Sequence, residues 1–209
     1  MKSILLTTLA LTLSLSAFSQ VKDIDGNEYE TVKIGKQEWM TENLNVTHFR
    51  NGDEIPQAKT AEEWKKAGQE GRPSWCYTNF DESNGMQYGI LYNFYSISDS
   101  RGLAPEGWKI PKEDDWITLE KTAGDARNLK SKSGWSANGN GNNISGFNAL
   151  PGGEITDNGE NDEIWGGYTS WWSITEVDNE TVWYFWIGPG SGFFYEEKGH
   201  GMHVRCIKD

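Results

Sequence analysis

The second half of this sequence consists of short aromatic segments separated by turns that are rich in glycine and asparagine. Residues 136–146 read SANGNGNNISG, and five short segments typical of β-strands follow: FNALPGG, SWWSIT, TVWYFWIG, GFFYEE and MHVRCIKD. Glycine lacks a Cβ and asparagine tolerates the left-handed conformation, so both residues favour turns. The sequence therefore predicts an irregular, loop-rich antiparallel β half.

The first half is predicted to combine a β-hairpin with short helices. The turn residues 25–27 (DGN) lie between two extended segments, which is a hairpin signal. A helix is expected in TAEEWKKAG, because Thr60 and Glu63 form a capping-box pattern and Gly68 is a typical end. Trp64 would face inward. A second helix is expected over 111–124, where acidic residues suit the positive N-terminal end.

Three consecutive segments between these helices are harder to assign. SWCYTNF (74–80) is predicted as a strand and DESNGMQYG (81–89) as a loop. ILYNFYSIS (90–98) is apolar and aromatic and fits a helix or a strand, of which the helix is favoured. The predicted fold class is therefore α+β, with short helices beside the β half.

The N-terminus is typical of a secretory signal peptide. Lys2 precedes an apolar stretch over 4–15, and Ala17 and Ser19 are the small residues expected before a cleavage site. A membrane anchor, the alternative, would need roughly 20 apolar residues. We expect a signal peptide over 1–19 and a single exported domain over 20–209, either secreted, periplasmic or on the cell surface, with no membrane insertion after cleavage.

Charge and motifs restrict the function. The net charge of −12 argues against nucleic acid and anionic membrane surfaces as partners. The sequence contains no H-E-x-x-H, no phosphate-binding P-loop and no G-x-S-x-G. On a strand, His200 and His203 would point to opposite faces, which disfavours a shared metal. Catalysis is therefore not expected.

The two cysteines, Cys76 and Cys206, are expected to form a disulfide if the protein is exported to an oxidising compartment. The alternative is two buried thiols that never meet, since the sequence does not supply the distance between them.

One acidic segment could hold calcium. DNGENDE (157–163) offers several oxygen ligands on a loop, with Asp157, Asn158 and Asp162 as the candidate ligands. The spacing matches no EF-hand, so a solvated loop is the alternative. No other cofactor is expected.

The eleven tryptophans suggest either an aromatic core or a sugar-binding surface. Trp75 and Tyr77 would share one face of the strand predicted over 74–80, with Asn79 next on that face. Trp165 and Tyr168 lie in a glycine-rich segment. Exposed rings beside amides and carboxylates suit a sugar, because rings pack on its C–H faces while polar groups bind its hydroxyls.

Trp171 and Trp172 are adjacent, so on a strand their rings point to opposite faces. We expect one ring to fill the main core and the other to pack under the glycine-rich loops.

Six segments, in order, carry a family resemblance: DIDGNEYETVKIGKQEWMTENLN, YGILYNFYS, APEGWKIPKEDDWITLE, SGFNALPGG, GGYTSWWSITE and GMHVRCIKD. From about residue 21 to 209 the chain resembles the Fibrobacter succinogenes major paralogous domain of exported and surface proteins in Bacteroidetes and Fibrobacteres. The resemblance implies a distant relation to the C-type-lectin-like fold, which also includes the formylglycine-generating enzymes. It further implies that the first and last strands pair.

The chain departs from its relatives at several positions. Ala104 replaces a cysteine of the relatives, so no disulfide can join that position to Cys206, whereas Cys76 matches another position that is commonly cysteine. The lectin triplets Glu-Pro-Asn and Gln-Pro-Asp are absent, and no paired catalytic cysteines are visible. The resulting hypothesis is a non-catalytic module that binds a polysaccharide or another cell-surface ligand. The alternative is a structural or protein-interaction domain of the cell surface, with a formylglycine-generating-type enzyme a distant third.

Overall fold

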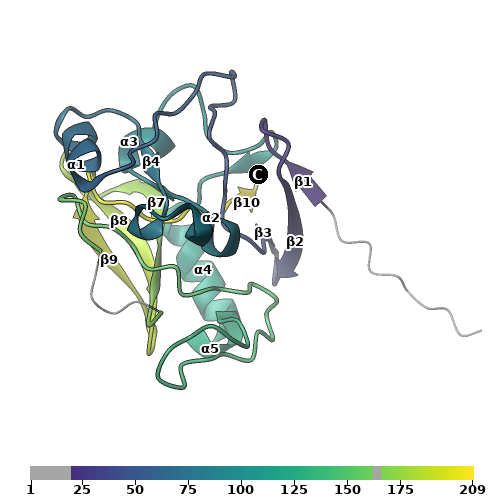
Figure 1. Cartoon of the computed structure of the whole chain (residues 1–209). Helices are drawn as coiled ribbons and strands as arrows, with labels where there is room; N and C mark the ends of the chain where they lie inside the picture. Colours follow the sequence, from purple (N-terminus) through teal and green to yellow (C-terminus); the bar gives the residue numbers. More distant parts are fainter. Residues whose placement is uncertain (1–19, 162–165) are drawn as a thin grey trace, which may run out of the picture.

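The computed structural model describes residues 20–161 and 166–209 (Figure 1). The predicted signal peptide lies outside the described residues, and so do Asp162 and Trp165. The strands are β1 (Gln20–Lys22), β2 (Glu28–Ile34), β3 (Gln37–Met40), β4 (Trp75–Cys76), β5 (Leu91–Tyr92), β6 (Trp108–Lys109), β7 (Thr169–Glu176), β8 (Thr181–Ile187), β9 (Ser191–Glu197) and β10 (Ile207–Lys208). The helices are α1 (Ala61–Gln69), α2 (Glu82–Tyr88), α3 (Phe94–Ile97), α4 (Glu113–Ala123) and α5 (Ala126–Leu129), with a 3₁₀ turn over Thr78–Phe80.

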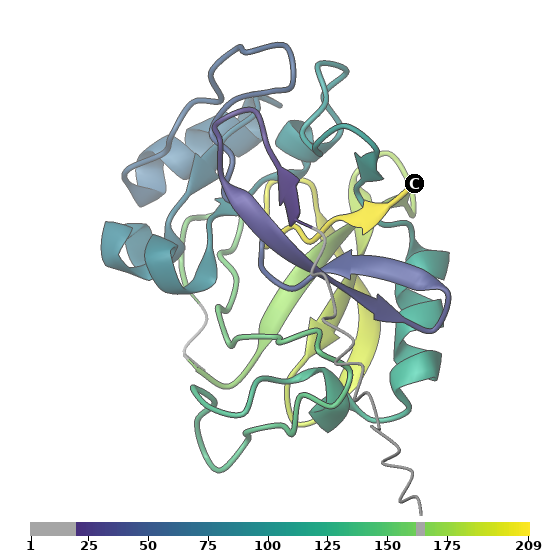
Figure 2. The same cartoon turned by 90° about the vertical axis from the view of Figure 1, so that its right-hand side faces the viewer.

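The described strands form three antiparallel sheets, which confirms the α+β class. One sheet has the order β1-β2-β3-β10-β6, a second pairs β4 with β5, and a third has the order β7-β8-β9. Helix α4 lies between the first and third sheets (Figures 1 and 2). Its Trp116 packs on Trp39 of β3 and on Phe185 of β8, with ring centroids 4.8 and 5.1 Å apart. The Trp116 ring of α4 therefore contacts both sheets.

The N-terminal hairpin forms as expected, with Val21 opposite Tyr29 across the β1–β2 turn. The predicted pairing of the first and last strands is wrong, because β1 pairs with β2 and not with β10. The last strand, β10, pairs with β3 through Ile207 and Trp39, and also with β6. Strand β1 lies at the edge of the same sheet, because the chain turns again at Gly35 and strands β2 and β3 both lie between β1 and β10.

The two helices with clear end signals are confirmed. The Thr60 hydroxyl accepts a hydrogen bond from the backbone N–H of Glu63, and α1 ends one residue after Gly68. Trp64 is fully buried, as predicted. Helix α4 ends at Gly124, which adopts a left-handed φ of 73°. Local capping chemistry therefore predicted the start of α1 and the end of α4, whereas Gly68 lies inside α1, whose C-cap is Glu70.

The predictions for residues 74–98 were mostly wrong. The strand predicted over 74–80 is only two residues long, and Tyr77 lies beyond its end. The predicted loop over 81–89 contains α2, whose first turn is capped by the side chain of Asp81. The predicted helix over 90–98 is divided into β5 and α3. Asn93 separates them, because its side chain accepts a hydrogen bond from the backbone N–H of Ser96 at the start of α3.

The paired tryptophans of β7 are both fully buried, and their rings point to opposite faces of the strand, as predicted. The expectation that one ring packs under the glycine-rich loops is met only in part, because Trp171 lies in a second core cluster with Trp116 of α4 and Phe185 of β8. Trp172 belongs to the largest cluster of buried side chains and contacts Phe94, at 5.9 Å between ring centroids. Trp171 packs against Phe147, which follows the glycine-rich loop, at 5.7 Å. The two rings are therefore buried in two different core clusters, one on each face of β7.

The disulfide expected between Cys76 and Cys206 is absent. Both cysteines are free and buried. Cys76 packs in a small cluster with Leu91 and Ile155, whereas Cys206 belongs to the largest cluster. The prediction rested on the oxidising environment of an exported protein, and an environment does not bring two side chains within bonding distance.

Candidate functional site

The aromatic pocket is a cavity of about 440 Å³ beside the three-stranded sheet. Its lining comprises Lys130, Ser136, Ala137, Gly139, Glu154, Gly167, Tyr168, Tyr184, Trp186 and Pro189. The strands supply the rings, and the glycine-rich loop after α5 supplies small residues. Volumes of about 300 to 1,000 Å³ are usual for sites that bind small molecules.

Strand alternation positions two of the rings. Tyr184 and Trp186 are two residues apart on β8, so both point to the same face of the sheet. On β9, Phe194 lies directly opposite Tyr184 and contacts both rings, with centroids 5.9 and 6.2 Å away. Phe194 is 50% exposed and Trp186 is half-buried, so the pair forms an accessible apolar surface.

Two glycines keep this surface open. Gly192 lies opposite Trp186 on β9 and has no side chain to cover the indole. A Cβ at Gly188 would lie 2.2 Å from the Trp186 ring, which is a severe clash. The ring therefore lies against the backbone at Gly188, a position that only glycine can occupy without displacing it.

Lys130 supplies a cation to the pocket wall. Its Nζ donates a hydrogen bond to the carbonyl of Gly188 at 2.7 Å and lies 3.9 Å from the centroid of the Trp135 ring. Burial, together with the nearby charge of Arg127, lowers the pKa of Lys130 below its usual value. In the part of the chain that the structure describes, no carboxylate lies within 4.0 Å of this ammonium group.

A carboxylate, Glu154, lines the same pocket. Burial raises the pKa of Tyr184, and the charge of Glu154 adds to this effect, which indicates that the two side chains are neighbours. The pocket thus combines an apolar aromatic surface with the cation of Lys130 and the carboxylate of Glu154. Such a lining can pack against an apolar face while it binds hydroxyl groups.

The model of the Fibrobacter succinogenes major domain matches residues 32–208. The chain belongs to this family. No curated protein and no solved structure matches the chain. The matched segment of the major domain extends from β2 to β10, so it contains every residue of the aromatic pocket. Within residues 20–161 and 166–209, no helix is long and apolar enough to cross a membrane.

The sugar-binding surface predicted around Trp75 does not form in this major domain. Trp75 is only 6% exposed, and its indole N–H donates to the carbonyl of Ile55 at 2.9 Å. Tyr77 packs edge-on against Trp75 at 5.2 Å between ring centroids. Asn79 is exposed, but it lies in the 3₁₀ turn with a φ of 58° rather than on a strand. The Trp75 ring, which was predicted to be exposed for sugar binding, is therefore part of the hydrophobic core.

Of the second predicted pair, Tyr168 lines the aromatic pocket of the major domain. Trp165 lies outside the described residues. The calcium candidates Asp157 and Asn158 are neighbours on a loop, where the Asn158 amide donates to the Asp157 carboxylate at 3.3 Å. Asp162, the third candidate, is not among the described residues. Among those that are described, no group of three potential metal ligands is found.

The prediction missed the residues that form most of the aromatic pocket. Tyr184 and Trp186 could have been found from TVWYFWIG, where aromatic residues occupy both faces of one strand. When aromatic residues occupy both faces of a strand, one face can pack in the core while rings on the other face line a pocket. Lys130 carries no comparable signal, because a lone lysine after a helix is usually solvated.

Proposed function

We propose that this chain is an exported, non-catalytic binding module that holds a saccharide in the aromatic pocket. One observation carries the proposal: the half-exposed rings of Trp186 and Phe194 adjoin a cavity that also contains Lys130 and Glu154. The C–H face of a sugar ring packs on an indole. The ammonium group donates to hydroxyl oxygens, and the carboxylate accepts from hydroxyl groups.

The proposed binding function agrees with a C-type-lectin-like fold. We infer a C-type-lectin-like fold for two reasons. The last strand, β10, lies in one sheet with the N-terminal strands β1, β2 and β3, and the loop-rich second half of the chain forms a separate sheet from β7, β8 and β9. We further infer that the segment 1–19 directs export, from the composition of that segment. An exported module would encounter polysaccharides outside the cell, which are therefore the proposed ligands.

Binding of a saccharide can be tested by screening the purified domain on glycans of plant, host and bacterial origin. The Trp186→Ala variant removes the half-exposed indole and should weaken binding at least about 10-fold, or about 1.4 kcal/mol. Tyr195→Ala is the matched control, because Tyr195 is an exposed ring on β9 that points to the opposite face from Phe194. The proposal fails if no glycan binds, or if both variants bind as the wild type does.

A structural or protein-interaction role is the second candidate, and it rests on β9. Among the described strands, β9 pairs only with β8, and its consecutive residues Phe194 and Tyr195 are exposed. Exposed aromatic residues on an edge strand are features of protein-binding surfaces. In this case Phe194→Ser and Tyr195→Ser would abolish capture of a surface protein, while glycan arrays would remain blank.

A further inference from the structure

Arg205 is a buried cation that the aromatic pocket does not use. Its side chain is 1% exposed and lies over the ring of Phe147, 4.3 Å from the centroid. Its Nε and one terminal nitrogen donate to the amide oxygen of Asn43 at 3.1 and 2.7 Å, and the other terminal nitrogen donates to the carbonyl of Phe147. A guanidinium group has five N–H donors. Two of them therefore remain for another acceptor.

The charge of Arg205 has no close counterpart. Among residues 20–161 and 166–209, no carboxylate lies within 4.0 Å of the guanidinium group. Burial lowers the pKa of Arg205 to about 9, and the charge of Glu42 partly opposes this effect, so the group is still a cation at neutral pH. Buried charges in proteins are usually paired, because desolvation of an unpaired ion is costly.

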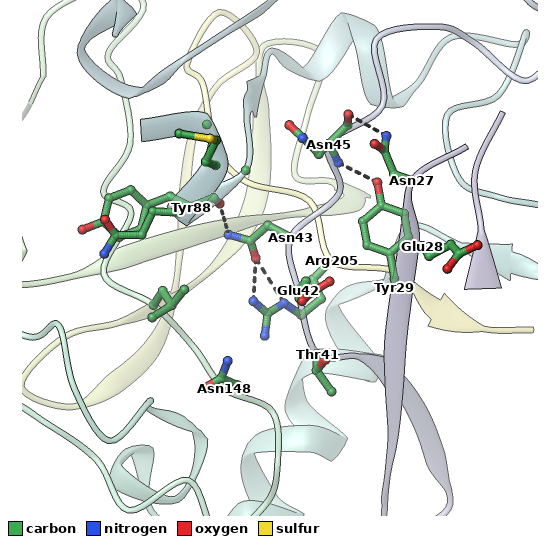
Figure 3. A pocket seen from close by; sticks show the side chains of 15 residues that line it. Asn27, Glu28, Tyr29, Thr41, Glu42, Asn43, Asn45, Tyr88, Asn148 and Arg205 are labelled. Carbon is green, nitrogen blue, oxygen red and sulfur yellow. Dashed lines mark hydrogen bonds between the residues drawn. The ribbon is translucent and has the colours of Figure 1, made fainter. Parts of the chain in front are cut away.

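Arg205 lines a second hollow, the polar pocket, of about 320 Å³ (Figure 3). This pocket lies between the β1–β2 hairpin, the segment 41–45 and α2, and it shares no lining residue with the aromatic pocket. Its polar lining residues include Glu28, Glu42, Asn43, Asn148 and Arg205. The side-chain amide of Asn43 contacts the guanidinium group directly.

Asn43 holds the guanidinium group in place. Its amide oxygen accepts from Arg205 and also from the indole N–H of Trp171 at 2.8 Å. Its amide nitrogen donates to the carbonyl of Tyr88 at 2.8 Å (Figure 3). A donor that is fixed before binding loses little entropy when a ligand arrives, which favours tight recognition.

The polar pocket also carries negative charge. Glu28 and Glu42 are exposed lining residues, and Glu28 faces Lys22 at 3.6 Å. Glu42 forms no ion pair within the described part of the chain. A ligand with only a carboxylate would be attracted by Arg205 but repelled by Glu42. A ligand with only an ammonium group would be attracted by Glu42 but repelled by Arg205. A ligand with both charges satisfies both side chains.

We propose that the polar pocket binds a small zwitterion of the free α-amino acid class. The carboxylate of the ligand pairs with the two remaining N–H donors of Arg205, and the side-chain amide of Asn148 donates to it. The ammonium group of the ligand pairs with Glu42. Charge-assisted hydrogen bonds between a guanidinium group and a carboxylate are among the strongest in proteins.

Calorimetry on the full domain tests this proposal with free L-amino acids and with single-charge analogues. L-alanine, for example, is compared with propionate, which lacks the amine, and with ethylamine, which lacks the carboxylate. We expect at least one amino acid to bind, and its two analogues to bind at least about 10-fold more weakly. The proposal is overturned if no amino acid binds, or if the carboxylate alone binds as tightly.

Variants of the exposed Glu42 and the half-buried Asn148 separate recognition from folding, because Arg205 itself is part of the core. Glu42→Gln should weaken amino-acid binding about 10-fold by removing the partner of the ammonium group. Asn148→Asp should abolish binding, since it places a negative charge beside the carboxylate of the ligand. Glu30→Gln, an exposed residue of β2 outside the pocket, is the control and should bind as the wild type does. Unchanged binding in both Glu42→Gln and Asn148→Asp would refute the site.

Discussion

Asn43 and Trp171 are joined by a hydrogen bond of 2.8 Å, although 128 residues separate them in the sequence. The amide oxygen that accepts from the indole also accepts twice from Arg205, near the end of the chain. A single buried amide thus ties together the segment after β3, the strand β7 and the segment before β10. Three donors depend on one acceptor, so this position is a weak point of the fold.

We expect Asn43→Ala to lower the free energy of unfolding by about 3 kcal/mol, because it leaves a buried guanidinium and a buried indole N–H without their acceptor. Urea unfolding at neutral pH measures the change. Asn45→Ala is the control, since Asn45 is half-buried nearby and its side chain takes part in none of these bonds. Equal stability of the two variants would show that Asn43 is not a shared acceptor.

His203 should make the fold sensitive to mild acid. Its side chain is fully buried, and burial together with the charge of Arg205 lowers its pKa to about 4 from an ordinary value of 6.5. Between these values the unfolded chain binds a proton that the folded chain does not. Stability therefore falls as the pH is lowered from 6.5 to 4, by up to about 3 kcal/mol.

Urea unfolding of the wild type and of His203→Gln at several pH values isolates this effect. Glutamine does not titrate, so the free-energy difference between the two proteins should change across this pH window and stay constant above pH 7. A difference that is the same at pH 7 and pH 4 would mean that His203 does not titrate on unfolding.

Both cysteines should be unreactive in the native protein. Burial raises the pKa of the Cys76 and Cys206 thiols well above the ordinary range, and both side chains are fully buried. Iodoacetamide should therefore modify neither cysteine in the folded protein and both in urea. Mass spectrometry measures the number of alkylated cysteines in each state. A native mass lower than the reduced mass by two hydrogens would instead reveal a disulfide.

The turn between β8 and β9 offers a matched pair of glycine variants for the aromatic pocket. A methyl group at Gly188 would clash with the Trp186 ring at 2.2 Å, whereas nothing lies within 4 Å of a methyl group at Gly190. We expect Gly188→Ala to displace the indole, which should shift tryptophan fluorescence and weaken saccharide binding about 10-fold. Gly190→Ala should behave as the wild type. Identical spectra and binding for both variants would contradict the packing described for Trp186.

The candidate sites were only partly visible in the sequence. Tyr168 was predicted because glycines surround it, and it lines the aromatic pocket. Trp75 had an equally good local pattern, yet the carbonyl of Ile55 and the ring of Tyr77 enclose it. An exposed ring and a buried ring have the same neighbours in sequence. Only the contacts with distant segments distinguish them.

The sequence by itself determined the elements whose signals are local. Capping residues at Thr60 and Gly124 set helix ends, and aromatic segments between turns set β7, β8 and β9, because both effects act over a few residues. The tertiary structure alone decided that Cys76 and Cys206 lie in separate clusters and that Arg205 is buried against Asn43. Burial and pairing depend on segments far apart in the chain, and local propensity contains no information about which of them meet.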